Sequence, residues 1–417
     1  MNEYVALLRR NANYRNLWLA KLISYLGDWF NLLASARLIS ELTGSGTAIS
    51  GLFLVRFLPL FFMSPIAGVA ADRFSRRQIM IASDVLRTIT VLGFLLIRSP
   101  NQLWLLYVLT ALQFSLSAFF VPAERALLPS VVEDEDLVAA NALDGFTWST
   151  MLAVGSLLGG LATAAFGKDI AFILDALTFL FSAGFVSRII VPSLTPEERA
   201  ERAASRGGFF QFLEGLDYLR VRPFILGLAL AKAGGSLIWG AVNVLEIPLS
   251  LQYPLAANSD GTLTLSLFYM FTGLGTGFGP IFLRRWIGDG RTASLRAVAG
   301  GFAMLAVGLV GIGLARILPW IFVSTFVRAL GTGSLWVFSS ALLQRLVERR
   351  FRGRVFAFEF AALTLTQSIS VLWAGLAQDM LGLAIQRVFL IMGLSGIVVL
   401  GVWLLFIRRY QDETQHG

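Results

Sequence analysis

Long apolar stretches bounded by polar residues recur along the whole chain of 417 residues. A helix that crosses a membrane needs about 20 mostly apolar residues. Twelve stretches meet this requirement, and they cover residues 16–40, 48–71, 78–97, 102–122, 138–166, 168–191, 223–250, 263–284, 295–315, 318–346, 355–378 and 385–407. The pattern predicts an all-α membrane protein with twelve transmembrane helices.

The longest polar stretch, residues 192–222, divides the predicted spans into two sets of six. We therefore expect an N-terminal six-helix bundle over residues 1–191, a cytoplasmic linker, and a C-terminal six-helix bundle over residues 223–417. Within the linker, residues 196–206 are charged and expected to be helical. Residues 209–220 alternate between apolar and polar positions at helical spacing, which predicts an amphipathic helix on the cytoplasmic membrane surface.

The two halves match each other weakly. When the second half is aligned with the first at an offset of 211 residues, Lys21 aligns with Lys232. At an offset of 215 residues, Asp144 aligns with Glu359. The matches keep one order along the chain, which suggests a duplicated six-helix unit of the kind that transporters use for alternating access.

Composition excludes a soluble protein and most enzyme chemistry. Hydrophobic residues make up 56% of the chain and charged residues 14%, whereas soluble domains have about 25% charged residues. The sequence has no cysteine, and its single histidine, His416, lies in the polar tail. No lysine follows the glycine spacing of a nucleotide-binding loop. We therefore expect neither an enzyme nor a bound metal or cofactor.

The net charge of +8 is distributed unevenly along the chain. The interiors of the spans contain equal numbers of basic and acidic residues, and the loops after odd-numbered spans contain four of each. The surplus of basic residues therefore lies in the termini and in the loops after even-numbered spans. Basic residues are enriched in cytoplasmic loops, and this asymmetry predicts that both termini are cytoplasmic. It also favours contact with anionic lipid over a nucleic-acid partner.

The second cytoplasmic loop contains the segment Gly-Val-Ala-Ala-Asp-Arg-Phe-Ser-Arg-Arg, residues 68–77. It resembles the loop signature of the major facilitator superfamily between spans 2 and 3, although Ser75 stands where that family usually has glycine. The resemblance implies that the matching residues control conformational switching; they are Gly68, Asp72, Arg73, Arg76 and Arg77. A basic loop that only sets the topology is the alternative interpretation.

Further motifs narrow the resemblance. Leu26–Trp29, Val121–Pro129 and Arg352–Val355 look like segments of the branch that contains bacterial enterobactin exporters and related drug pumps. Because these motifs occur in both halves, the resemblance implies the major facilitator fold of two pseudo-symmetric six-helix bundles. It also implies a small-molecule substrate and a multi-pass location in the bacterial inner membrane, and we expect a monomer.

Span 5 contains three glycines, Gly155, Gly159 and Gly160, in a segment similar to the glycine-rich motif of exporters in this superfamily. Ser156 replaces the usual proline, so the motif is half present. Ordinary packing of small residues between helices explains the glycines equally well.

Charged residues inside spans are costly and by default suggest function. Asp28 lies near the middle of span 1 and is the first candidate for a residue that carries or gates the coupling proton. Asp175 is the next candidate. The alternative for Asp28 is a structural pair with Arg56 or Arg87. Asp84 and Arg87 are three residues apart on one helix, so we expect them to satisfy each other.

Two acids near the starts of spans 5 and 11, Asp144 and Glu359, are expected to form gating contacts between the halves. Lys232 and Glu246 lie on one face of span 7, but their depths differ by roughly 21 Å at 1.5 Å per residue. They therefore cannot pair directly, and we assign Glu246 to an outer gate.

The expected substrate cavity combines aromatic side chains with a few bases from spans 1, 2, 4, 7 and 10. Its candidate residues are Tyr25, Trp29, Arg56, Phe114, Phe119, Lys232, Trp239, Arg328 and Trp336. The leading hypothesis is a secondary active transporter that exports amphipathic drugs or siderophores by alternating access, coupled to protons. The alternatives are a facilitator or importer of a small solute, and a non-transporting membrane receptor or scaffold.

Overall fold

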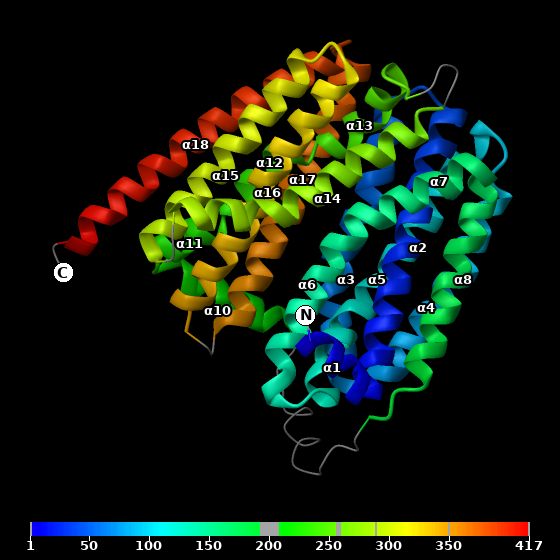
Figure 1. The fold of residues 1–417 in the computed structure, drawn as a ribbon, viewed down its shortest axis with the longest axis horizontal. Helices are drawn as coiled ribbons and strands as arrows, with labels where there is room; N and C mark the ends of the chain where they lie inside the picture. The colour runs from blue at the N-terminus through cyan, green and yellow to red at the C-terminus, as the bar shows by residue number, and fades with distance from the viewer. Residues whose placement is uncertain (1, 192–207, 256–259, 288–289, 349–350, 416–417) are drawn as a thin grey trace. The chain divides into compact units, whose positions relative to one another are not determined.

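A computed structural model of the chain describes residues 2–191, 208–255, 260–287, 290–348 and 351–415. In these ranges every regular element is a helix, as Figure 1 shows, and the predicted all-α class is confirmed. The chain folds into two compact units. Unit 1 comprises Met1–Gly44 and Val55–Phe209, and unit 2 comprises Ser45–Leu54 and Phe210–Gly417. Residues 196–206, predicted to be helical, lie outside the described residues.

Unit 1 is built from helices that pack in pairs around α2 and α4. Its helices are α1 (Asn2–Arg10), α2 (Ala12–Leu42), the second part of α3 (Gly46–Arg73), α4 (Arg76–Gly93), α5 (Leu103–Val131), α6 (Leu137–Thr150), α7 (Ser156–Phe166) and α8 (Lys168–Ser187). Helix α8 packs against both α2 and α4, and α4 packs against α5 (Figure 1). This arrangement brings the polar faces of α2, α4 and α5 together.

The start of α2 is fixed by a side-chain cap. The Asn11 side chain accepts a hydrogen bond from the Tyr14 amide at 2.9 Å and donates one to the Val131 carbonyl at 2.7 Å. Such a cap satisfies an amide at the helix N-terminus that has no partner within the helix. The Tyr14 hydroxyl, buried in the same core, donates to the Ala140 carbonyl at 3.1 Å. These bonds tie α2 to the ends of α5 and α6.

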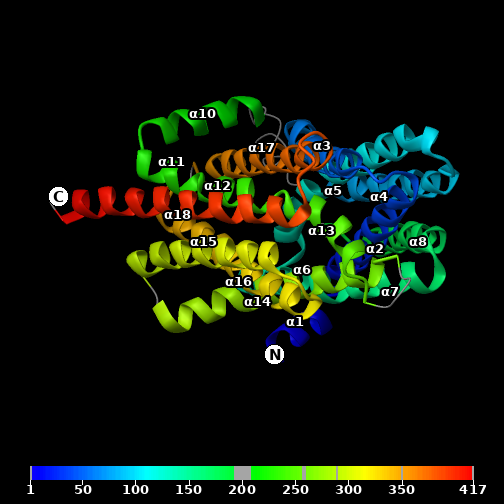
Figure 2. The ribbon, with the colours of Figure 1, turned by 90° about the horizontal axis from the view of Figure 1, so that it is seen from above.

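Unit 2 contains α10 (Gly208–Arg220), α11 (Pro223–Ala229), α12 (Ala231–Trp239), α13 (Val242–Gln252), α14 (Thr262–Ile287), α15 (Arg291–Leu314), α16 (Leu318–Leu346), α17 (Arg352–Asp379) and α18 (Ile385–Gln415). Helix α16 packs against α14 and α15, α18 lies along α15, and α12 packs against α17 (Figure 2). Gly275 of α14 makes the α14–α16 contact close, because a methyl group there would lie 2.5 Å from the Cβ of Ala329.

Eleven helices in the described ranges are long and apolar enough to cross a membrane. The exception among the twelve predicted spans is the first, α2, which is 31 residues long. Its charged side chains, Lys21, Asp28 and Arg37, lower its hydropathy, and each of them forms an ion pair with another helix or within α2. Polar contacts within unit 1 therefore keep α2 in its position. A uniformly apolar surface does not do so for this helix.

The predicted seventh span is confirmed as a span, Pro223–Gln252, and the structure builds it from three consecutive helices, α11, α12 and α13. The break after Trp239 falls at Gly240, where a methyl group would lie 2.8 Å from the Ser236 carbonyl oxygen. In span 5, α6 and α7 are joined by a π-helical turn, Met151–Gly155. Such turns are rare and occur mostly at functional sites.

The first residues of α3 belong to unit 2 because α17 holds them. The Asp379 carboxylate accepts hydrogen bonds from the Gly46 amide at 2.9 Å, the Thr47 amide at 2.8 Å and the Ser45 hydroxyl at 2.6 Å. Deeper along the same contact, the Ser50 hydroxyl donates to the Val371 carbonyl at 2.9 Å. An acid from α17 thus caps the N-terminus of α3.

The amphipathic helix predicted for residues 209–220 is present as α10. Its described side chains contact protein, however. Glu214 pairs with Arg354 of α17 at 2.8 Å, and the Tyr218 ring stacks on Phe351 with centroids 4.3 Å apart. Leu219 is completely buried. This half of α10 therefore packs on unit 2, which corrects the expectation that its whole apolar face lies on lipid.

Candidate functional site

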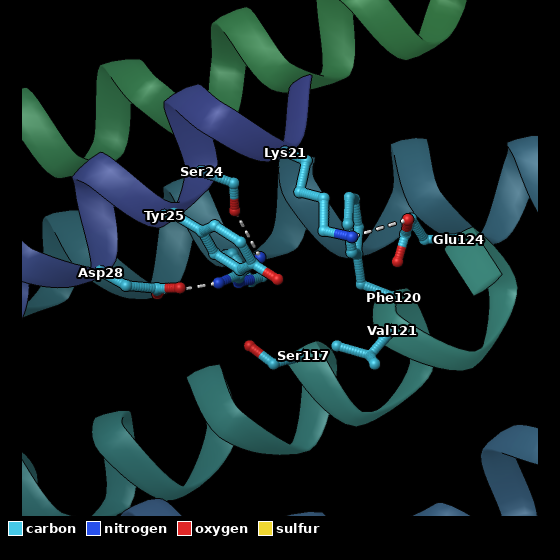
Figure 3. Close-up of a pocket in the computed structure, with 9 residues that line it drawn as sticks. Lys21, Ser24, Tyr25, Asp28, Ser117, Phe120, Val121 and Glu124 are labelled. Atoms are coloured by element: carbon cyan, nitrogen blue, oxygen red, sulfur yellow. Dashed lines mark hydrogen bonds and ion pairs between the residues drawn. The ribbon is translucent and has the colours of Figure 1, made fainter. Parts of the chain in front are cut away.

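A small polar pocket opens in unit 1 between α2, α4 and α5 (Figure 3). Its volume is about 50 Å³, and its walls are formed by Lys21, Ser24, Tyr25, Asp28, Arg87, Ser117, Phe120, Val121 and Glu124. A pocket for a drug-sized ligand has roughly 300–1,000 Å³. The pocket therefore has room for a proton carrier, a few water molecules or one small group of a larger ligand.

At one end of the pocket, Arg87 is shared by two acids. Its guanidinium lies 3.0 Å from Oδ1 of Asp28 and 3.4 Å from Oδ1 of Asp84. The Asp28 side chain is 31% exposed, whereas that of Asp84 is completely buried and accepts a hydrogen bond from Ser182 at 2.6 Å. The Phe179 ring covers Arg87, with the guanidinium carbon 3.7 Å from the ring centroid. Asp28 is thus the member of this group that solvent can reach.

Arg87, one of the two bases considered for Asp28, is the base that pairs with it. The expectation that Asp84 and Arg87 satisfy each other is incomplete, because Arg87 also binds Asp28. The other base, Arg56, lies 3.4 Å from Oδ1 of Asn31 and stacks on Phe114 at 4.4 Å from the ring centroid.

At the other end of the pocket, Lys21 is also shared by two acids. Its Nζ lies 3.1 Å from Oε1 of Glu124 and 2.7 Å from Oδ2 of Asp144, and Figure 3 shows the contact with Glu124. All three side chains are at most 15% exposed. The pocket therefore joins two groups of the same composition, each with one base and two acids.

Asp175 lies outside the pocket, on the face of α8 that packs against α2. Its side chain is completely buried, and neither carboxylate oxygen accepts a hydrogen bond within 3.5 Å from the described residues, although the Asn31 amide of α2 faces it. The contact with α2 depends on Gly27, where a methyl group would lie 2.5 Å from Oδ1 of Asp175. A buried carboxylate without hydrogen bonds is costly, so this position calls for an explanation in terms of function.

Among its described residues, unit 2 has two buried ion pairs, each with one base and one acid. Lys232 lies 3.0 Å from Glu359, and Arg328 lies 3.2 Å from Glu246. Lys232 also donates to the Ser340 hydroxyl at 2.6 Å and sits 4.4 Å from the ring centroid of Trp336. As expected, Lys232 and Glu246 do not pair with each other.

Asp144 and Glu359, the two acids predicted to gate between the halves, each have an ion-pair partner within their own unit. Asp144 pairs with Lys21 of α2, and Glu359 pairs with Lys232 of α12. Their gating role stays a prediction.

The sequence profile of the Major Facilitator Superfamily matches residues 17–318. The chain belongs to this superfamily. It is therefore a transporter and a multi-pass membrane protein, and the predicted resemblance is confirmed. Ionisable residues inside membrane spans are by default candidates for function, so the pocket of unit 1 becomes the candidate site.

Two curated relatives of the superfamily cover nearly all of this chain. The putative bacilysin exporter BacE of Bacillus subtilis (strain 168) is 25% identical, over 98% of this chain and 99% of that protein. Macrolide efflux protein A of Streptococcus pyogenes is 23% identical, over 91% of this chain and 92% of that protein. Both names describe export.

Among solved structures, the nucleoside transporter NupG matches with a TM-score of 0.73 at 12% sequence identity. The match covers 94% of this chain and 99% of that one. At this identity the likeness shows the superfamily fold alone.

The superfamily loop signature lies at the end of α3 and the start of α4. The side chains of Gly68, Asp72 and Arg73 are outside the described part of the structure. Arg76 donates to the Ala126 carbonyl and lies 3.4 Å from the Ser130 hydroxyl of α5, whereas Arg77 donates to the carbonyls of Val186 and Ser187. The described arginines therefore tie the start of α4 to the ends of α5 and α8.

The glycines of span 5 hold α7 against α2. A methyl group at Gly155 would lie 2.7 Å from Cδ1 of Trp29, and one at Gly159 would lie 2.9 Å from the Trp29 carbonyl oxygen. Gly160 is buried beside them. Close helix packing thus explains two of the three glycines, and it positions the turn of α2 that carries Asp28.

The expected cavity residues are divided between the two units. In unit 1, Tyr25 lines the pocket, whereas Arg56 and Phe114 stack on each other, and Trp29 and Phe119 are half-buried. In unit 2, Lys232 contacts Trp336, Arg328 pairs with Glu246, and Trp239 ends α12.

Two pocket residues that the sequence did not single out are Lys21 and Glu124. Lys21 precedes Tyr25 by four residues and Asp28 by seven, so all three share one face of α2. This spacing could have indicated that Lys21 faces the same site as Tyr25 and Asp28. Glu124 sits near the end of span 4, inside a motif that was considered for its resemblance rather than for its charge.

Proposed function

We propose that this chain is a proton-coupled exporter of amphipathic small molecules that works by alternating access. The observation that carries the proposal is Asp28, a carboxylate that forms an ion pair with Arg87 while 31% of its side chain stays exposed in the pocket. A coupling group has to be reached by protons and still be held in a low-dielectric environment, and Asp28 meets both requirements.

The relatives support the direction of transport. BacE is named as a putative bacilysin exporter and the streptococcal protein as a macrolide efflux protein. We infer that this chain also moves small molecules out of the cell, and that Asp175 is a second acid that protons reach during the cycle. A proton on Asp175 would remove an unpartnered buried charge.

The proposal includes a location. We place the protein as a monomer in the bacterial inner membrane, with both termini in the cytoplasm and its basic loops on anionic lipid. A reporter fused after Arg409 that works only in the cytoplasm supports this orientation, and activity on the other side of the membrane contradicts it.

The pocket of unit 1 is too small for a whole amphipathic molecule, so we assign it to coupling. The larger substrate cavity is proposed to involve the aromatic side chains Trp29, Trp239 and Trp336. The loop signature, with Asp72, Arg73 and the described arginines, is proposed to control the conformational change.

The experiment is accumulation of a labelled macrolide and of bacilysin in everted membrane vesicles, with and without an imposed pH gradient. Asp28→Asn should abolish accumulation driven by the gradient and leave binding to the purified protein within about twofold. The matched control is Asp169→Asn, because Asp169 is 43% exposed and pairs with Arg98 at 2.6 Å on the outside of unit 1.

Three outcomes would contradict the proposal. Gradient-driven accumulation by Asp28→Asn removes Asp28 as the coupling residue. Uptake that equilibrates without a gradient identifies a facilitator. Binding without any flux identifies a receptor.

A further inference from the structure

The function proposed above gives no separate role to the group formed by Lys21, Glu124 and Asp144, although two of its members line the pocket. It is almost completely buried, with exposed side-chain fractions of 13%, 5% and 15%. With all three groups ionised it holds one base and two acids, and therefore one uncompensated negative charge. An uncompensated charge is strongly unfavourable in a low-dielectric interior.

The internal repeat provides a reference for this group. Lys21 corresponds to Lys232 at the offset of 211, and Asp144 corresponds to Glu359 at the offset of 215. Both units keep the resulting lysine–carboxylate pair, at 2.7 Å in unit 1 and 3.0 Å in unit 2.

The third member of the group differs between the units. At the offset of 215, Glu124 corresponds to Ser339. The adjacent Ser340 is the residue that accepts a hydrogen bond from Lys232, at 2.6 Å. A neutral hydroxyl in unit 2 thus takes the place of a carboxylate in unit 1, and only unit 1 carries the surplus charge.

The geometry also indicates which acid of unit 1 is the surplus one. Asp144 lies closer to the lysine than Glu124 does, at 2.7 Å against 3.1 Å, and it is more exposed. Both properties stabilise the ionised form of Asp144. Glu124 is more buried and also lines the pocket, where water can deliver a proton.

Other charged and titratable groups surround Glu124 without cancelling this surplus. Asp28 and Arg87 share its pocket, and Arg87 already serves two acids. The remaining groups that act on Glu124, or on the ends of its helix, are Tyr14, Tyr25, Arg76, Asp144 and Arg125. Of the two bases among them, Arg76 is held by the Ala126 carbonyl of α5 and Arg125 follows Glu124 on the same helix.

We propose that Glu124 is a further proton-binding residue of unit 1, distinct from Asp28 and Asp175, with Lys21 held by Asp144 when Glu124 is protonated. The step is the binding of one proton to a carboxylate oxygen, and no other bond changes. Unit 1 then takes up two protons at the pocket, one at each end. Their use in transport rests on the proposed proton coupling, whereas proton binding itself does not.

The test measures protonated carboxyl groups by infrared difference spectroscopy on the purified full-length protein between high and low pH. Glu124→Gln should lose the signal of one buried carboxyl group, and Asp28→Asn should lose a different one. The double variant should lose both. The matched control is Glu359→Gln, which should lose none in this range because Glu359 is the single acid of its pair.

Two further variants keep the test decisive if Glu124→Gln folds poorly. Glu124→Ser copies the side-chain chemistry of unit 2 and should also remove one signal. Ser340→Glu adds a second acid to Lys232 and should create a new one. An unchanged spectrum of folded Glu124→Gln or Glu124→Ser overturns the proposal, as does a signal that disappears only together with that of Asp28.

This measurement separates the two proposals. If the Glu124 signal is present while Asp28→Asn still accumulates substrate with the pH gradient, proton binding at Glu124 stands and the coupling role of Asp28 fails. If Asp28→Asn abolishes coupling while the Glu124 variants keep the wild-type spectrum, the proton site at Glu124 fails alone.

Discussion

The two units bury their charges in different proportions. In unit 1, Lys21 and Arg87 are each shared by two acids, and a pocket joins the two groups. In unit 2, Lys232 and Arg328 each have one acid partner, and the four side chains are at most 5% exposed. Ion pairs with one base and one acid need no further ligand, whereas a base shared by two acids leaves a charge that a proton or a cation can neutralise. The difference supports the proposal that protons bind in unit 1, whereas the ion pairs of unit 2 are consistent with a structural role.

The sharpest test of balanced pairing in unit 2 is the removal of one partner. Arg328→Leu leaves Glu246 buried without its base, and breaking a buried ion pair in this way costs about 3–5 kcal/mol. Arg328→Leu combined with Glu246→Leu should recover most of that loss, since both charges are gone. Thermal unfolding in detergent, followed by tryptophan fluorescence, measures both effects. If Arg328→Leu is as stable as the wild type, Arg328 does not neutralise a charged Glu246 in the folded protein.

A smaller effect should distinguish the two lysines. Glu359→Gln removes the single acid of Lys232 and should cost about 2 kcal/mol, because Ser340 and Trp336 still contact the lysine. Asp144→Asn should cost about 1 kcal/mol or less, because Lys21 keeps Glu124. The comparison needs only the ratio of the two losses. If Asp144→Asn is the more damaging, the sharing of Lys21 contributes nothing to stability.

Packing around the pocket offers a third test. Gly159→Ala places a methyl group against the α2 backbone and should cost about 1–3 kcal/mol. It should also shift the infrared signal of Asp28, which directly precedes Trp29 on α2. Gly184→Ala in α8 is the control, because nothing lies within 4 Å of the added methyl group, and it should stabilise the protein slightly. A shift of the Asp28 signal in both variants would mean that the α2–α7 contact is not responsible.

The smallest effect concerns an ion-paired acid of unit 1 that lies outside the predicted spans. Burial alone would raise the pKa of Glu41, but hydrogen bonds from Lys168 and Arg37 lower it below the ordinary value of 4.5. A lowered pKa in the folded state adds stability above the pKa of the unfolded chain, and this stability is lost as the pH falls through the folded value.

Glu41→Gln should therefore cost no more than about 0.5 kcal/mol at pH 7, because the Glu41 side chain is 40% exposed and solvent screens the pair. The difference between the variant and the wild type should vanish well below pH 4.5. Melting curves at several pH values measure it, and a difference that grows toward acidic pH contradicts the sign.

The sequence predicted the fold class because membrane helices are specified by length and hydropathy. It also predicted α10, whose apolar and polar residues alternate at helical spacing. It did not predict the break at Gly240, because glycine is common inside membrane helices and gives no signal of its own. The close approach of Ser370, with its Cβ 2.9 Å from where a methyl group would sit, appears only in three dimensions.

For the site, the sequence identified Asp28 and offered Arg87 as one of two bases. It could not identify Arg87 as the partner, since a charge pattern gives depth along a helix but not the face that a neighbouring helix presents. For the same reason it could not identify the lysines that pair with Asp144 and Glu359. The lysines that bind these acids lie on α2 and α12, more than 100 residues away in sequence.

The π-helical turn at Met151–Gly155 amounts to one inserted residue in an otherwise regular helix. Deleting one residue inside this turn would leave a regular α-helix, and Gly159 would keep its orientation toward Trp29 because the turn already absorbs the extra residue. The same deletion in the regular helix between the turn and Gly159 would rotate the residues after it by about 100° about the helix axis, since an α-helix has 3.6 residues per turn. Span 5 should therefore tolerate the loss of one residue at Met151–Gly155 better than the loss of one just after it, even though hydropathy and span length change equally little in both.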